Sequence, residues 1–393
     1  MKADTRELLG TISVYLGSAF SVAGVQAVGP GLPNLQNHFQ LSDSHTLWAI
    51  SFYLFPGIIF AVPLGKLADR VGRMKIYGFC LLVFGFSSLI IPLAGFSWPL
   101  FLAIRILQGT AFAGIFPLSI ILTAQHAKGS SILKRQGFRS VTQQIADTAT
   151  PLIGGILVAA AWYAPYLVGV STLPVAAVVF FLRFEDDYRV DKQDKTAEKL
   201  KILGNRPLIS IIFGGFFRFF VKFVPLSSLG IMLVNQRGYS AVFAGFALAL
   251  SSFVGIFGAI SVGRLSKYLS PFTISASTLV LLSLSLLALS VTGNLVAILI
   301  AVSVFGFSDG LFGTVQNSYV AVAVPNHLRG TFSGIVAMSR NLGKFLAPIV
   351  MGLVLVKASI STAFAVSGVI AALGLLLMPP LRHFNKQLSQ SAL

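Results

Sequence analysis

Residues 65–75 read GKLADRVGRMK and separate two apolar runs, 46–64 and 76–95. Each run is close to the ~20 mostly apolar residues that an α-helix needs to cross a lipid bilayer. The stretch between them is rich in lysine, arginine and aspartate. It therefore predicts a short charged loop that lies outside the membrane and joins two membrane-spanning helices.

The side chains of this loop suit a tight turn at the membrane surface. Gly65 and Gly72 allow a tight turn and a close approach of helices. Asp69 can accept hydrogen bonds from a neighbouring helix N-terminus, where negative charge is favoured. Arg70 and Arg73 can pair with acids or with lipid phosphates on the cytoplasmic face.

The composition of the whole chain is that of a membrane protein. Of the 393 residues, 55% are hydrophobic and only 10% are charged, with a mean hydropathy of +0.84, whereas soluble domains carry about 25% charged residues. The net charge of +17 does not indicate nucleic-acid binding, because the basic residues fall between apolar runs. The single cysteine, Cys80, excludes an intrachain disulfide.

Twelve apolar stretches are long enough to cross a bilayer, so we predict an all-α membrane protein with twelve transmembrane helices. These stretches are 8–31, 46–64, 76–95, 98–122, 138–161, 165–183, 207–234, 241–262, 272–292, 295–322, 332–356 and 360–379. Nearly all lysines and arginines between them fall in alternate loops and at the termini, and only Arg237 and Lys357 lie on the opposite side. The excess of positive charge on the cytoplasmic side of membrane proteins then places both termini in the cytoplasm.

The chain is expected to form two pseudo-symmetric six-helix bundles, 1–184 and 206–393, joined by a cytoplasmic linker at 185–205. The linker is the longest polar stretch of the sequence. The halves resemble each other weakly, because the proline and glycine of 151–155 recur at 348–352. Internal repeats of this kind are typical of secondary transporters, whose substrate site lies between the repeats.

GKLADRVGRMK resembles the signature G-x-L-a-D-r-x-G-r-k between helices 2 and 3 of the major facilitator superfamily. Its glycines, aspartate and both arginines are in register, although Met74 stands at a usually basic position and Lys75 follows it. In that family the loop latches the two halves in the outward-facing state. The resemblance therefore implies a latch formed by Gly65, Asp69, Arg70, Gly72 and Arg73.

The stretch Arg105-Ile-Leu-Gln-Gly109 is similar to an R-x-x-Q-G pattern that is linked to proton coupling in the family. The resemblance implies a role in proton coupling for Arg105. Alternatively, Arg105 lies near the outer end of its helix and extends to water.

The stretch Thr150-Pro-Leu-Ile-Gly-Gly155 resembles the G-P-x-x-G-G motif of antiporters in the family, with Thr150 in place of the first glycine. Pro151 is expected to bend the helix, and Gly154 and Gly155 to let another helix approach closely. The alternative is ordinary helix packing without bearing on the direction of transport.

Away from the ends of the predicted spans, seven charged residues lie at membrane depth, where each charge costs at least ~2.5–3.5 kcal/mol. The basic ones are Arg105, Arg218, Lys222, Arg340 and Lys344, and the acidic ones are Asp147 and Asp309. Proton coupling needs a group that gains and loses a proton, and Asp147 is the first candidate, before Asp309. By the internal repeat, Asp147 and Lys344 are expected to face one cavity. Alternatively, the acids only neutralise bases within the protein and the other bases reach water.

The remaining bases are candidates for substrate binding, together with several uncharged polar residues. The predicted substrate-binding residues are Arg218, Lys222, Arg340, Lys344, Gln26, Gln143, Gln316 and Asn317. The first span carries no acid, and the bases exceed the acids, so a neutral or anionic substrate is favoured over a lipophilic cation.

We therefore expect a proton-coupled antiporter that exports small organic molecules or drugs by alternating access. The alternatives are a proton-coupled symporter for an organic anion or a sugar-like solute, and a lipid flippase of the same fold. The sequence has no metal-ligand spacing, cofactor motif or catalytic constellation, so no cofactor, metal or enzymatic activity is expected. The expected setting is a monomer in a prokaryotic inner membrane, in contact with lipids, protons and substrate but not with nucleic acid.

Overall fold

The computed structural model describes residues 3–125, 130–182, 205–323 and 329–384. Within these residues the chain is helical and contains no β-strand. The described residues belong to two compact units, Met1–Asp191 with Leu233–Phe246, and Lys192–Met232 with Ala247–Leu393. We call them unit 1 and unit 2. The predicted linker at 185–205 lies outside the described residues except for Asn205, and the predicted boundaries of the two halves stay predictions.

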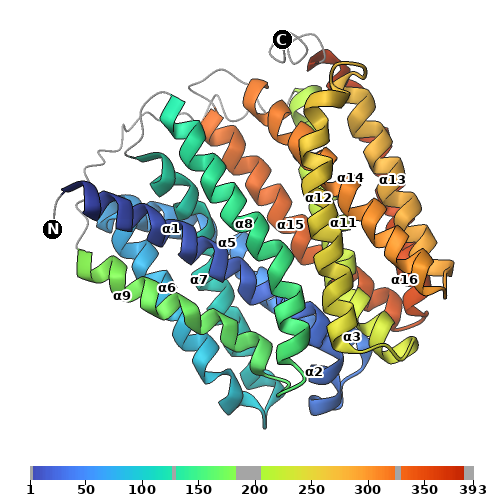
Figure 1. Cartoon of the computed structure of the whole chain (residues 1–393), viewed down its shortest axis with the longest axis horizontal. Coiled ribbons are helices and arrows are strands. Elements are labelled where there is room, and N and C mark those ends of the chain that lie inside the picture. Colours follow the sequence, from blue (N-terminus) through green and yellow to red (C-terminus); the bar gives the residue numbers. More distant parts are fainter. Residues whose placement is uncertain (1–2, 126–129, 183–204, 324–328, 385–393) are drawn as a thin grey trace. The chain divides into compact units, whose positions relative to one another are not determined.

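Unit 1 is built around α1, which packs against α7, α8 and α9, while α6 and α5 pack on α7 (Figure 1). Its helices are α1 (Ala3–Gln26), α2 (Leu32–Phe39), α3 (Asp43–Thr46), α4 (Trp48–Leu54), α5 (Pro56–Val71), α6 (Arg73–Ile90), α7 (Trp98–Gln125), α8 (Ser130–Leu157) and α9 (Thr172–Leu182). Short 3₁₀ turns lie at Gly29–Gly31, Ile91–Ala94 and Ala164–Ser171.

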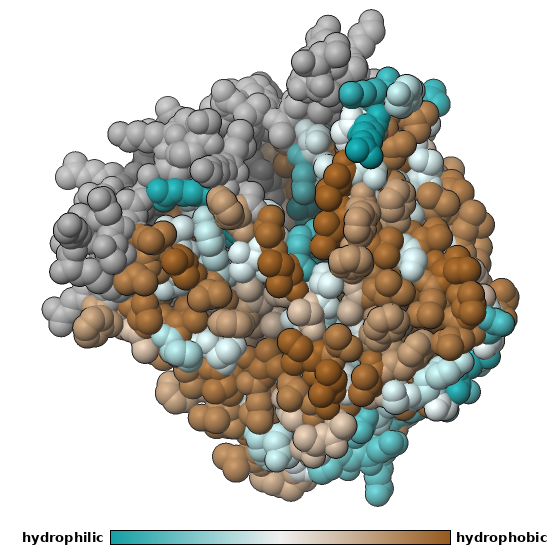
Figure 2. All heavy atoms as spheres, viewed as in Figure 1, coloured by the Kyte–Doolittle hydropathy of each residue, from teal (hydrophilic) through white to brown (hydrophobic). Residues whose placement is uncertain are grey.

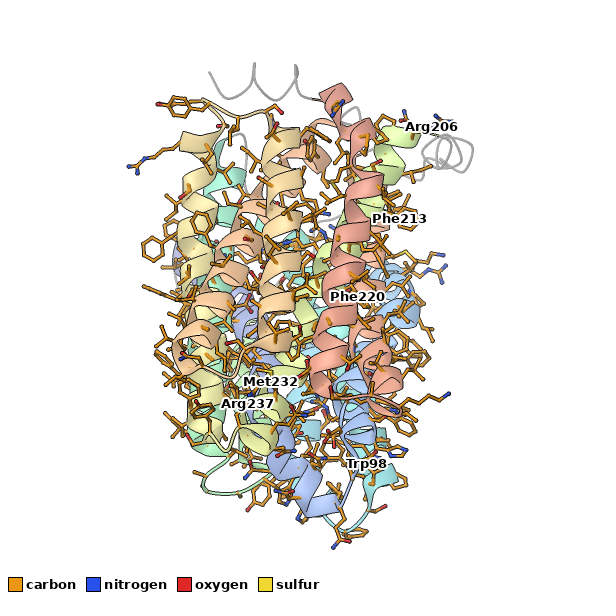
Figure 3. All side chains as sticks on the ribbon, turned by 90° about the vertical axis from the view of Figure 1, so that its right-hand side faces the viewer. Trp98, Arg206, Phe213, Phe220, Met232 and Arg237 are labelled. Carbon is orange, nitrogen blue, oxygen red and sulfur yellow. The ribbon has the colours of Figure 1, made fainter. Side chains whose placement is uncertain are left out.

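Unit 2 pairs α11 closely with α15, and α13 with both α14 and α16. Its helices are α11 (Arg206–Ile231), α13 (Pro271–Val291), α14 (Leu295–Val322), α15 (Arg329–Leu355) and α16 (Ile360–Leu373), followed by 3₁₀ turns at Gly374–Leu377 and Pro379–Phe384. Helix α12 (Ala241–Leu265) begins in unit 1 and continues in unit 2. Arg206, Phe213 and Phe220 follow one another along α11, and Met232 opens the π-helical turn Met232–Gln236 at its end (Figure 3).

Helices occupy all twelve predicted stretches. Judged by length and composition, ten of the described segments are long and apolar enough to cross a membrane. Helices α8 and α15 contain 28 and 27 residues, which is sufficient length, yet they are less apolar than the others. The sequence places Asp147 on α8 and both Arg340 and Lys344 on α15. Crossing by these two helices, and the cytoplasmic location of the termini, therefore stay predictions.

The surface of the described residues is largely apolar, with hydrophobic side chains spread over the visible face (Figure 2). Large side chains such as Phe181, Phe257 and Ile260 are exposed in great part. A soluble monomer rarely exposes contiguous apolar patches larger than a few hundred Å². A surface of this kind fits a lipid environment, where apolar side chains are at no disadvantage.

Two helix boundaries differ from the prediction. The charged stretch at 65–75 is not a loop, because α5 continues through Gly65 to Val71 and only Gly72 interrupts the helices before α6 begins. Leucine, lysine, alanine and arginine are good helix formers, so the helix extends beyond its apolar run. Similarly, α8 begins at Ser130 rather than near 138, which places Arg139 well inside a helix instead of at its start.

Candidate functional site

The turn at Gly72 depends on glycine. Its backbone has φ 118° and ψ 125°, a region that side-chain-bearing residues rarely adopt. On either side of it, the Arg73 guanidinium donates to Asp69 Oδ1 at 2.8 Å, and Arg73 is only 7% exposed. A Cβ added to Gly65 would meet no described atom within 4 Å, so the expected tight turn and close approach at Gly65 are not found. The latch role of these residues, Arg70 included, stays a prediction.

Arg105 on α7 is completely buried within unit 1. Its Nε donates to the Ala49 carbonyl at 2.9 Å, and its Nη1 donates to Gln108 Oε1 at 2.7 Å. The guanidinium carbon lies 4.4 Å from the centre of the Tyr53 ring and 5.3 Å from that of Tyr166. Arg105 therefore does not extend to water, and uncharged groups hold it between α4, α7 and the 3₁₀ turn at 164–171.

The rest of the R-x-x-Q-G pattern belongs to the same arrangement. The Gln108 amide donates to Ser88 Oγ at 2.8 Å, which links α7 to α6. A Cβ on Gly109 would collide with the carbonyl oxygen of Tyr53 at the end of α4. The pattern thus joins three helices through one arginine, one amide and one close backbone contact. A role of Arg105 in proton coupling stays a prediction.

On α8, Asp147 contacts the polar residue that the sequence singled out on α1. The side-chain amide of Gln26 donates to Asp147 Oδ1 at 3.0 Å, and Gln26 is only 7% exposed. One turn earlier, Gln143 accepts from Arg139 Nη1 at 3.2 Å. Arg139 is 9% exposed, and its guanidinium carbon lies 5.9 Å from the centre of the Phe116 ring.

Sequence reasoning missed Arg139 because it lies at the very start of the predicted span 138–161 and was counted with the charged stretch before it. Its spacing of four residues from Gln143 was the available signal, because residues at that spacing share a helix face. The expected common cavity of Asp147 and Lys344 joins residues of different units and stays a prediction.

The two glycines that follow Pro151 lie at close backbone contacts. A Cβ on Gly154 would collide with the Ala27 backbone after α1, and one on Gly155 would meet the Ala241 carbonyl at 2.5 Å. Pro151 lies inside α8, which continues to Leu157. The bend at Pro151 stays a prediction, as does any bearing of this segment on the direction of transport.

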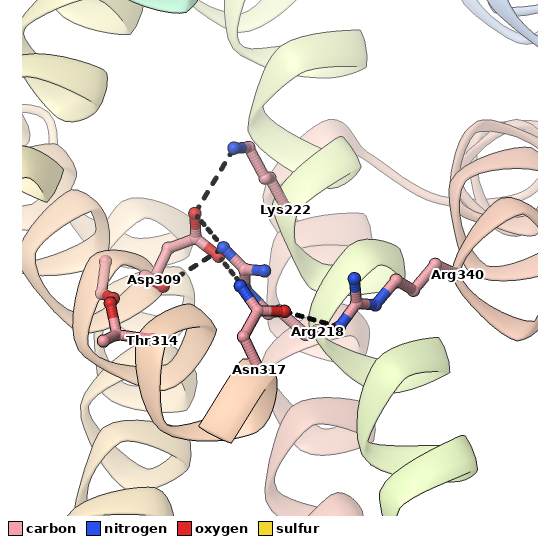
Figure 4. Close-up of polar contacts among 7 residues, drawn as sticks. Arg218, Lys222, Asp309, Thr314, Asn317 and Arg340 are labelled. Carbon is pink, nitrogen blue, oxygen red and sulfur yellow. Dashed lines mark hydrogen bonds and ion pairs between the residues drawn. The ribbon is translucent and has the colours of Figure 1, made fainter. Parts of the chain in front are cut away.

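Unit 2 holds a buried ion cluster of one acid and two bases (Figure 4). Arg218 Nε on α11 donates to Asp309 Oδ1 on α14 at 2.8 Å, and its Nη2 lies 3.3 Å from Oδ2. Lys222, one turn further along α11, places Nζ 3.4 Å from Oδ2. The side chains of Arg218 and Asp309 are 12% and 13% exposed. The two like charges on α11 are therefore bridged by a single carboxylate.

Glycines of α14 make room for this cluster. A Cβ on Gly313 would collide with the guanidinium of Arg218. Gly306 and Gly310 lie against α12 instead, where a Cβ on either would collide with a carbonyl oxygen of that helix. Asp309 thus lies in a segment of α14 packed directly on α12, which explains the small residues around it.

A second pair of bases lies on α15. Arg340 Nη2 donates to Asn317 Oδ1 on α14 at 2.8 Å, and Lys344 Nζ donates to Asn341 Oδ1 at 3.4 Å. Both cations lie near the Phe219 ring of α11, with the Arg340 guanidinium carbon 5.7 Å and the Lys344 Nζ 4.8 Å from its centre. The structure thus brings the basic residues predicted on α11 and α15 together with Asn317.

Gln316, also on α14, is buried and donates through Nε2 to the Ile211 carbonyl at 3.4 Å. Its Oε1 has no hydrogen-bond partner among the described residues. Gln316 therefore ties α14 to α11 and offers one unused acceptor. In the described residues no three His, Cys, Asp or Glu side chains come together as metal ligands could.

Comparisons with known proteins agree with this architecture. The sequence model of the Major Facilitator Superfamily matches residues 14–348. The chain is 26% identical to the 3-(3-hydroxy-phenyl)propionate transporter of Escherichia coli K12, covering 87% of this chain and 86% of that protein. It is 24% identical to the bacillibactin exporter of Bacillus subtilis, covering 81% and 83% respectively.

Among solved structures, a D-xylose–proton symporter superposes with a TM-score of 0.75 at 14% identity, covering 95% of this chain and 97% of that one. At this identity the likeness shows the fold. Together with the family match over most of the chain, it shows that the chain belongs to the Major Facilitator Superfamily, a family of multi-pass membrane transporters and not of enzymes.

Proposed function

We propose that this protein is a proton-coupled secondary transporter of small organic molecules, working by alternating access in a bacterial inner membrane. The observation that carries the proposal is the cluster in which Asp309 is shared by Arg218 and Lys222 inside unit 2. A buried ion pair is weak evidence for stability, since desolvation offsets much of the attraction. Two bases beside a carboxylate favour its ionised form, so Asp309 would take up a proton when Arg218 and Lys222 move away from it during the transport cycle.

Protonation of Asp309 would remove the one negative charge that bridges the two bases. Breaking a buried pair in this way costs about 3–5 kcal/mol unless another anion or water replaces the lost partner. The proton therefore changes the affinity of the cluster for other charges, which is what coupling requires. Asp147, held by Gln26, is the second candidate carrier, in unit 1.

For the direction of transport, export by proton antiport is the first candidate. It is supported by the resemblance of residues 150–155 to the antiporter motif and by the relative named as a bacillibactin exporter. Substrate would bind to one conformation and the proton to the other. Because no phosphate-binding Gly-rich motif is present in the sequence, the proton gradient is the proposed source of energy.

The ion cluster itself favours a second candidate, proton-coupled uptake of an organic anion. A proton on Asp309 would free Arg218 and Lys222 for an incoming anion, so proton and anion would bind better together than apart. The relative named as a 3-(3-hydroxy-phenyl)propionate transporter supports an organic acid as substrate.

Proteoliposomes with an imposed pH gradient separate the two candidates by the sign of solute flux. Antiport moves solute against the direction of proton flow, and symport moves it with the protons. In either case Asp309→Asn should abolish accumulation driven by the gradient while solute exchange at equal pH persists. Asp147→Asn is the parallel variant in unit 1. Undiminished gradient-driven accumulation in both variants would contradict the proposed proton carriers.

A further inference from the structure

Four bases in the interior of α11 and α15 differ in what they contact. Arg218 and Lys222 share Asp309, and Lys344 takes part in interactions beyond its bond to Asn341. Arg340 is different. Its polar contact is the uncharged Asn317 amide oxygen, and its Nε is buried without a hydrogen-bond partner among the described residues.

The guanidinium is only partly compensated in this state. The Arg340 side chain is half-buried and its bond to Asn317 is exposed. Its buried Nε has no partner among the described residues, and a buried donor without a partner costs about 1–3 kcal/mol. The neighbouring charge of Arg218 is also positive, and both guanidinium carbons lie near the Phe219 ring, at 5.0 and 5.7 Å from its centre. The ring eases this crowding, since an aromatic face attracts cations.

Arg340 also has room built for it. A Cβ on Gly215 of α11 would lie 3.3 Å from Arg340 Cγ and 3.1 Å from Gln316 Nε2, closer than side chains usually approach. The side chains of Gln316 and Arg340, each with one unpartnered polar atom among the described residues, thus flank the same glycine. The site presents a forked cation without an acid, beside hydrogen-bonding amides.

We infer that Arg340 and Asn317, with Phe219 as a positioning residue, form an oxyanion subsite for the carboxylate of an organic acid. Guanidinium is the side chain that best matches a carboxylate, through two parallel hydrogen bonds. The inference deepens the proposed transport function and rests on it. It assigns the substrate class as organic acids rather than neutral or cationic compounds.

The purified full-length protein in detergent allows a direct test with three matched probes: 3-phenylpropionate, its uncharged amide 3-phenylpropionamide, and the cation 3-phenylpropylamine. Isothermal titration calorimetry should give the tightest binding for the acid. Arg340→Gln should weaken binding of the acid about 10- to 100-fold, the range for hydrogen bonds to charged groups, and should change binding of the amide little.

Asn317→Asp provides a sharper variant. The new carboxylate would occupy the position of the amide oxygen, 2.8 Å from Arg340 Nη2, and would pair with Arg340 in place of the substrate. Affinity for the acid should fall at least tenfold. The matched control is Asn294→Asp on the same helix, where Asn294 caps the exposed start of α14 and aspartate caps equally well. That control should bind the acid as the unmodified protein does.

Phe219→Leu should weaken binding of the acid, and Phe219→Tyr should restore it, because the tyrosine ring also attracts cations. Equal binding of acid and amide, no binding of the acid, or an unchanged affinity in Asn317→Asp would overturn the inference. Displacement of the acid by phosphatidylglycerol but not by phosphatidylcholine in mixed micelles would assign the oxyanion subsite to a lipid headgroup and would also overturn it.

Proton flux into proteoliposomes separates this inference from the proposed function, with protein-free vesicles to subtract passive permeation. If the amide or the amine drives proton movement and the acid does not, the transporter proposal stands and the organic-acid inference fails. If the acid binds in an Arg340-dependent manner and no probe moves protons, the subsite stands and proton coupling fails.

Discussion

Arg105 of unit 1 and Arg218 of unit 2 are both arginines removed from water, and they are held in opposite ways. Arg105 is bound by a backbone carbonyl, an amide and two tyrosine rings, and no charged group is among these contacts. Arg218 shares a carboxylate with Lys222 and keeps 12% of its side chain exposed. A cation held by groups that do not titrate near neutral pH stays in place and contributes to stability. A cation held by an acid can be released when that acid is protonated.

The largest expected effect is on stability at Arg105. In Arg105→Ala the Ala49 carbonyl and Gln108 Oε1 lose their donor and a cavity opens between α4 and α7, so we expect a loss of about 3–5 kcal/mol in the free energy of unfolding. Thermal unfolding in detergent, followed by circular dichroism, measures it. Arg340→Ala is the matched variant in unit 2 and should cost less than about 1 kcal/mol. Equal losses at both positions would contradict the structural role assigned to the buried contacts of Arg105.

A double-mutant cycle on the ion cluster sharpens the same comparison. Asp309→Asn leaves two cations without their shared acid and should cost about 3 kcal/mol, while Arg218→Gln with Asp309→Asn should recover about half of that. Unfolding midpoints of the single and double variants give the coupling energy. A coupling near zero would mean that water already screens this cluster.

Glycine substitutions extend the comparison to the motif residues. Gly109→Ala forces a Cβ onto the Tyr53 carbonyl and should destabilise unit 1 by about 1–3 kcal/mol. Gly65→Ala meets no described atom and lies inside α5, so it should be neutral or stabilise by up to about 1 kcal/mol. If Gly65→Ala nevertheless abolishes transport at unchanged stability, the implied latch gains direct support. Loss of stability in Gly65→Ala would contradict the open space around Gly65 in the structure.

A moderate effect is expected at the turn between α5 and α6. Gly72→Ala places a side chain at φ 118°, which should cost about 1–2 kcal/mol, and Gly238→Ala at φ 72° is the control for a positive φ outside the motif. Proteolysis rates and unfolding midpoints of the two variants can be compared. A larger loss for Gly238 than for Gly72 would show that the motif glycine is not specially constrained.

The helices could be predicted from the sequence because length and apolarity alone determine which segments are able to cross a bilayer. The same reasoning failed at 65–71 and 130–138, where helices continue into polar residues. Hydropathy indicates where a segment can leave the lipid. The hydrogen bonding of the helix backbone continues beyond that point wherever the residues favour a helix. Arg139 was missed for this reason.

The charged residues within the helices were predictable as a set because a charge in an apolar run is costly and therefore conspicuous. Their partners were not predictable. Asp309, Arg218 and Asn317 lie on different segments, and periodicity along one helix does not report which neighbour faces it. The sequence alone also left two interpretations of Arg105, as a proton-coupling residue or as a side chain that extends to water.

The sequence by itself determined the membrane class, the positions of the helices and the identity of the buried charges, since all three follow from the transfer energy of side chains in local segments. Only the tertiary structure decided that Asp309 pairs with Arg218 and Lys222, that uncharged groups hold Arg105, and that Arg340 meets an amide instead of an acid. Those outcomes depend on helix packing at glycines such as Gly109 and Gly313, where a close backbone approach brings together groups that lie far apart along the chain.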